Sequence, residues 1–255
     1  MDLLISGVLS LGSVAFFLRL ARSLEREPRI AVSSYGVPDA IFALLLVAWF
    51  VINIIGSYGQ KLVVNADMLV VNVVFALLLL ICLASFLIVR SLNPIKLFGL
   101  DFHALRRGLP AALIGLAVAL PVIYFIHALS FYFLGKPEPQ PLVQFLVNTT
   151  SWNDRLLLIL TAVVVAPVSE EVIFRGYIYG VARRYAGRWW ALAVSAVIFA
   201  AIHAHLPSLG GLLVLAVALT FIYEYTTSLW APIFAHAAFN GLTVAATLVW
   251  PDILK

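Results

Sequence analysis

The sequence predicts an all-α fold, a polytopic membrane helix bundle of about eight transmembrane helices. The chain is 64% hydrophobic and only 11% charged, whereas soluble domains carry about 25% charged residues. It also contains eight apolar segments of roughly 18–25 residues, the length that a bilayer core of about 30 Å requires. The net charge of +4 is small and scattered, so nucleic acid is not an expected partner and membrane lipid is.

The apolar segments follow one another with short connections. They lie near residues 2–21, 37–57, 68–89, 109–135, 154–181, 189–206, 208–226 and 229–249. Connections near Pro207 and Ser228 are the shortest, so the last three segments are expected to be antiparallel neighbours. The first segment has no basic region before it and no cleavage site of small residues after it. We therefore expect a retained helix and not a signal peptide. The multi-pass protein is expected in a bacterial or archaeal cell membrane.

Basic residues concentrate in the loops after the first, third and fifth segments. Because cytoplasmic loops carry an excess of Lys and Arg, this distribution predicts that both termini lie outside. Arg183 and Arg184 fit ordinary anchors at the inner membrane surface. Residues 94–108 are expected to form a short amphipathic piece on that surface, and residues 136–141 form a proline-rich spacer.

Strongly polar residues recur at similar depth in the second half of the chain. Glu170 lies 13 residues before Arg183, about 20 Å along a helix, and His203 lies 15 residues after Arg188, about 22 Å. His236 and Asn240 follow Ser228 by 8 and 12 residues, about 12 and 18 Å. Polar groups at membrane depth are costly and usually functional. Three helices are thus expected to bring them to one buried site.

Spacing within each helix predicts which groups face one another. Glu171 precedes Arg175 by four residues, the favourable order for an ion pair, so Glu171 is expected to be neutralised and Glu170 to stay free. His236 and Asn240 share one face because they are also four residues apart. Pro167 is expected to kink the fifth segment near the site.

The converging set supports two kinds of chemistry. A free carboxylate, two imidazoles and an amide can hold a water molecule, take its proton and stabilise an oxyanion. Glu170, His203 and His236 can equally be arranged as zinc ligands with an open position for water. The three other histidines, His103, His127 and His205, are expected to be packing or loop residues, since none has a polar partner in the pattern.

Three short motifs carry a family resemblance. They are Glu170-Glu171-x-x-x-Arg175, Phe199-x-x-x-His203 and His236-x-x-x-Asn240, in this order and on membrane segments. Each motif is weak alone, but together they resemble the CPBP family of intramembrane proteases. This family includes the CAAX prenyl endopeptidases and bacterial relatives linked to bacteriocin processing and self-immunity. The resemblance covers about residues 154–245, and we expect residues 154–250 to form the catalytic core after a motif-free region, 1–153.

The resemblance implies a role for each motif residue. Glu170 would activate a water molecule, His203 would position it, and His236 and Asn240 would face the oxyanion. Glu171 and Arg175 would hold the helix and adjust the local electrostatic field at the site, with Phe199 as a supporting residue. The implied activity is endoproteolysis of a membrane-associated or prenylated peptide or protein, with zinc left open.

Two other classes of function compete with proteolysis. A proton or ion transporter also carries Glu and His at membrane depth, but it often shows internal repeats and polar groups spread along a path. Neither feature is visible here. A non-catalytic immunity protein could use the same scaffold, and the intact motifs argue against it.

Overall fold

The computed structural model describes residues 3–26, 30, 32–57, 59–60, 63–135 and 138–250. This part of the chain is helical and has no β-strand, which confirms the predicted all-α membrane bundle. The main helices are α1 (Leu3–Arg26), α2 (Val37–Ser57), α3 (Ala66–Val89), α5 (Phe102–Leu134), α11 (Leu206–Thr226) and α12 (Trp230–Val249). A composite helix runs through α7 (Trp152–Leu160), η2 (Thr161–Val165), α8 (Ala166–Glu170), η3 (Glu171–Ile178) and α9 (Tyr179–Ala186).

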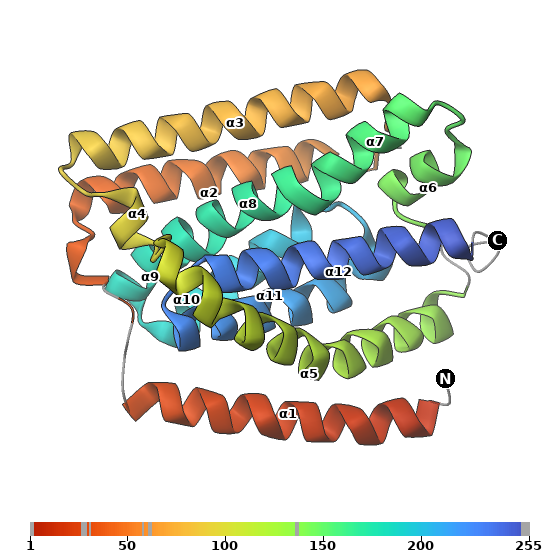
Figure 1. The fold of residues 1–255 in the computed structure, drawn as a ribbon, viewed down its shortest axis with the longest axis horizontal. Coiled ribbons are helices and arrows are strands. Elements are labelled where there is room, and N and C mark those ends of the chain that lie inside the picture. The colour runs from red at the N-terminus through yellow and green to blue at the C-terminus, as the bar shows by residue number, and fades with distance from the viewer. Residues whose placement is uncertain are drawn as a thin grey trace.

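Within the described part of the chain, seven helices are long and apolar enough to cross a membrane, and the eighth expected segment, α10 (Arg188–Ala201), has only 14 residues. The expected segment 189–206 is therefore shorter than predicted. Ala204 adopts a left-handed φ of 47°, and Pro207 lies in the first turn of α11, so the chain reverses before α10 reaches full length. The described ends, in α1 and α12, lie at the same end of the bundle (Figure 1), which requires an even number of passes. The short α10 accordingly counts as a pass.

The second half of the chain forms the centre of the bundle. The apolar stretch of α11 is 61% buried, against 11% for α3, and α11 packs on α5, α10 and α12. Gly115 of α5 permits a close approach, because a Cβ at this position would lie 2.6 Å from the side chain of Ile222. Small residues at such crossings let membrane helices pack tightly.

Residues 94–108 do not form one surface helix, contrary to the prediction. Pro94–Leu97 is a single turn, α4, and Phe102 already begins the long α5. The loop between them is fixed on the α11–α12 turn, since Ser228 Oγ donates to Gly99 O (2.6 Å) and Leu229 N to Phe98 O (3.0 Å). Gly99 has φ 59°, and a Cβ there would lie 2.1 Å from Thr227 O, so only glycine fits.

Two short elements were not predicted. The η1 turn (Val32–Ser34) precedes α2, and α6 (Pro141–Asn148) follows the proline-rich spacer. Residues 136–137 of that spacer lie outside the described part of the chain. Leu146 of α6 is buried with Leu69 and Leu158, so α6 packs between α3, α7 and α12 rather than projecting as a loop.

Candidate active site

The helix that carries Glu170 and Glu171 changes its winding on both sides of them. The segments η2 and η3 are wide π turns, and α8 between them keeps ordinary α spacing. Pro167 explains the first change, because a proline has no N–H and its ring clashes with the carbonyl four residues earlier. The predicted kink at Pro167 thus takes the form of a widened turn before it. Such π segments occur often at functional sites.

Glu171 is the hub of a fully buried polar cluster. Its Oε1 accepts hydrogen bonds from Arg175 Nη1 at 2.8 Å and from His236 Nδ1 at 2.8 Å. The side chains of Glu171 and Arg175 are 0% exposed. The predicted Glu171–Arg175 pair is therefore confirmed. The contact of Glu171 with His236 was not predicted, and it makes Glu171 part of the site as well as the partner of Arg175.

This contact orients the imidazole of His236 toward Glu170. The proton on Nδ1 is held by Glu171, which leaves Nε2 on the opposite side of the ring. His236 Nε2 lies 3.9 Å from Glu170 Oε2, too far for a hydrogen bond. The Glu170 side chain is 21% exposed, and its Oε2 is buried without a partner among the described residues.

Phe199 is the apolar centre around which the cluster is arranged. The Arg175 guanidinium lies over its ring at 4.1 Å, a cation–π contact that partly replaces lost hydration. The rings of His203 and His236 lie 5.2 and 5.6 Å from it. Phe199 is 0% exposed. Its buried ring therefore holds the two imidazoles and the guanidinium in place by packing against them.

His203 and Asn240 are each anchored to a backbone carbonyl. His203 Nδ1 bonds to Phe199 O at 2.8 Å, and Asn240 Nδ2 donates to Ala162 O at 2.8 Å. The carbonyl of Ala162 belongs to the π turn η2. A carbonyl cannot donate, so His203 keeps its proton on Nδ1 and leaves the Nε2 lone pair free. The Asn240 amide retains a second N–H.

The predicted residues fall into two sets in the structure: those bonded to one another and those bonded only to a backbone carbonyl. Glu170, Glu171, Arg175 and His236 lie in one cluster, with Phe199 in contact with both histidines. Neither His203 nor Asn240 bonds directly to a carboxylate of the described residues. The zinc alternative was Glu170, His203 and His236, and the described residues include no group of three His, Cys, Asp or Glu side chains that could hold a metal ion. The bond from His236 Nδ1 to Glu171 leaves its Nε2 free, as in a histidine that binds a metal through the other nitrogen, so it is the spacing of the three side chains that does not suit zinc in this arrangement.

A second ionic cluster was missed from the sequence. Glu224 of α11 is 2% exposed and bonds to Tyr179 and Arg183, and its Oε2 lies 2.5 Å from Arg188 Nη2. Arg183 is therefore not an ordinary surface anchor, whereas Arg184 is exposed. The sequence did contain one sign of this cluster, because Glu224 is an acidic residue in the last turn of an otherwise apolar segment. Glu224 ties α9, α10 and α11 together at the end where the basic loops lie.

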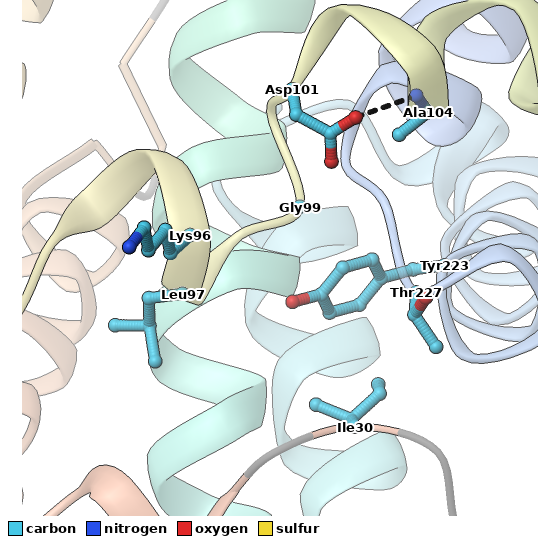
Figure 2. A pocket seen from close by; sticks show the side chains of 8 residues that line it. All are labelled: Ile30, Lys96, Leu97, Gly99, Asp101, Ala104, Tyr223 and Thr227. Carbon is cyan, nitrogen blue, oxygen red and sulfur yellow. Dashed lines mark hydrogen bonds between the residues drawn. The ribbon is translucent and has the colours of Figure 1, made fainter.

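Two hollows lie away from the cluster. One of about 300 Å³ lies where α4, the start of α5 and the end of α11 meet, with Tyr223 directed into it (Figure 2). The other, of about 490 Å³, is an apolar groove between α5 and α12. No residue that lines either hollow belongs to the Glu170–His236 cluster. Their chemistry is therefore separate from that of the site.

The region of the chain that contains the cluster is similar to known membrane peptidases. Residues 151–242 match the family model described as Rce1-like, type II CAAX prenyl endopeptidase Rce1-like. The chain is also similar to a putative membrane peptidase, YdiL, of Bacillus subtilis (strain 168), with 35% identity over 92 residues. That match spans 36% of this chain and 38% of the relative. No solved structure matches the chain. All six polar residues of the site, from Glu170 to Asn240, lie within residues 151–242, the region that is similar to the Rce1-like CAAX endopeptidase family and to the Bacillus membrane peptidase.

Proposed function

We propose that the protein is an intramembrane endopeptidase that uses a water molecule activated by Glu170. The observation that carries the proposal is that the two neighbouring glutamates have different contacts. Glu171 is bonded to Arg175 and His236, while Glu170 Oε2 has no partner among the described residues and faces His236 Nε2 at 3.9 Å. A carboxylate left free beside an oriented imidazole suits a general base.

The reaction follows from the remaining polar atoms. Glu170 takes a proton from water, the water oxygen bonds to the scissile carbonyl carbon, and the carbonyl becomes an oxyanion. The free Nε2 of His203 accepts the other O–H of the water. The second N–H of Asn240 and the Nε2–H of a protonated His236 donate to the oxyanion. Glu171 stabilises the imidazolium, as a carboxylate does in related dyads.

Collapse of the intermediate completes the hydrolysis. The proton held by Glu170 passes to the leaving nitrogen, the carbon–nitrogen bond breaks, and a carboxylic acid and an amine are released; the acid then gives its proton to the amine or to water. None of these steps requires a metal. The ionic pair Glu171–Arg175 and the ring of Phe199 keep the buried charges in place during the reaction.

The substrate is a membrane-associated peptide, and we propose a prenylated peptide with a CAAX-type C-terminus. The family description supports this substrate class. The test uses purified protein in nanodiscs and an internally quenched farnesylated peptide, with the same peptide without the farnesyl group as its control. Preferential cleavage of the farnesylated peptide is expected, with a loss of about 10²–10⁴ in rate for Glu170→Gln. Equal cleavage of both peptides would reject the prenyl preference but not the peptidase.

A further inference from the structure

The π turn η3 is held from outside by hydroxyl groups. Tyr35 Oη donates to Gly176 O at 2.8 Å, and Ser195 Oγ donates to Phe174 O at 3.3 Å. The N–H of Tyr179 also bonds to Phe174 O, five residues earlier. Buried backbone carbonyls need a partner. Side chains from two other parts of the chain therefore supply hydrogen bonds to the turn that begins at Glu171.

Tyr35 is fitted closely to this turn. It lies between η1 and α2, is 4% exposed, and its ring packs edge-on against Tyr177 at 5.9 Å. Gly180 leaves space for the ring, since a Cβ there would lie 2.8 Å from Tyr35 Cε2. Burial raises the pKa of the Tyr35 hydroxyl well above its usual range, and the nearby Tyr223 raises the pKa further. The hydroxyl consequently remains a donor at any physiological pH.

The register of η3 decides where Glu171 and Arg175 point. In a π turn, hydrogen bonds join residues five apart rather than four, so side chains rotate relative to an α-helix. Glu171 reaches Arg175 and His236 from this winding. A return to α spacing would turn the carboxylate relative to both partners. The carbonyl of Gly176 lies within this turn, and Tyr35 donates a hydrogen bond to it from outside the helix.

We propose that Tyr35 is a positioning residue of the site: its hydroxyl holds η3 in the register that brings Glu171 to Arg175 and His236. The residue lies outside the region that matches the family, 151–242, so the N-terminal half contributes to the site without touching the reacting atoms. The catalytic consequence rests on the proposed function, whereas the anchoring of η3 does not.

The test replaces only the hydroxyl. Tyr35→Phe keeps the ring on Gly180, and Tyr223→Phe is the matched control, because Tyr223 is also buried, whereas the hydroxyl bonds to carbonyls of η3 among the described residues come from Tyr35 and Ser195. Hydrogen exchange by mass spectrometry in nanodiscs follows peptides from residues 171–181. We expect Tyr35→Phe to raise their exchange about tenfold, as the loss of one buried hydrogen bond implies, and the control to exchange like the wild type.

Kinetics with the quenched farnesylated peptide give the second readout. Tyr35→Phe should lower kcat about tenfold with KM unchanged, because the turn orients catalytic groups rather than the peptide. Unchanged exchange in Tyr35→Phe, or an equal rise in Tyr223→Phe, overturns the anchoring. Raised exchange with wild-type kcat overturns the positioning role. If the wild type and Glu170→Gln cleave alike, the proposed function fails, and the exchange data still decide whether Tyr35 anchors η3.

Discussion

Replacing Glu171 by Gln is the substitution for which the structure best defines the loss in free energy of unfolding. The substitution keeps the shape of the side chain and an oxygen acceptor but removes the charge. Glu171 Oε1 makes two hydrogen bonds, to Arg175 and His236, both buried. Hydrogen bonds to charged groups contribute about 1.5–3 kcal/mol and neutral ones about 0.5–1.5. Loss of charge assistance at both therefore costs about 2–3 kcal/mol.

An independent comparison gives a similar value. Removal of one partner from a buried ion pair costs about 3–5 kcal/mol. The lower part of this range applies here, because Arg175 keeps its stacking on Phe199 at 4.1 Å. At about 2–4 °C per kcal/mol for a chain of this size, the melting temperature should fall by about 5–10 °C.

The assay is thermal unfolding of purified protein in one detergent, followed by intrinsic fluorescence. The matched control is Glu170→Gln, which changes the neighbouring, partly exposed carboxylate and should shift the midpoint by no more than about 1 °C. The double variant Glu171→Gln/Arg175→Met should recover stability, since it leaves no unpaired buried cation, but not cleavage. A Glu171→Gln protein that melts with the wild type would refute the reasoning.

Two further predictions concern the chemistry. Asn240→Ala should lower kcat about 10²–10³-fold, the usual cost of one oxyanion donor, in the peptide assay; a change in KM alone would remove Asn240 from that role. Extended treatment with a strong chelator should leave cleavage intact, since Glu170, His203 and His236 do not form a metal-holding group; about one zinc per chain by metal analysis, lost in Glu170 and His203 variants, would contradict this.

The sequence was sufficient to predict the helix bundle and the Glu171–Arg175 pair. Apolar length identified the spans, and α2 begins and ends where its segment was expected. Helical spacing identified the Glu171–Arg175 pair, because four residues separate neighbours on one face. These are local properties, so a linear pattern encodes them.

Other features depend on contacts between distant segments. The bond from Glu171 to His236 joins residues 65 positions apart. The π turns on both sides of Glu170 are held by partners from other parts of the chain, such as Asn240 on η2 and Tyr35 on η3. A periodicity of 3.6 residues assumes uniform winding and therefore gave no sign of the contact between Glu171 and His236. Glu224 was missed for a similar reason: its partners Arg183 and Arg188 lie about 40 positions earlier, and loop charges alone fit membrane anchors.

The most direct test of the central claim is a count of new protein N-termini in membrane fractions. Cells without the protein, with the wild type and with Glu170→Gln are compared by N-terminal proteomics, with expression of both forms matched by immunoblot. If Glu170 is the base that activates water, a set of termini appears only with the wild type, because an amide cannot take the proton. The same set of termini with Glu170→Gln would contradict the account.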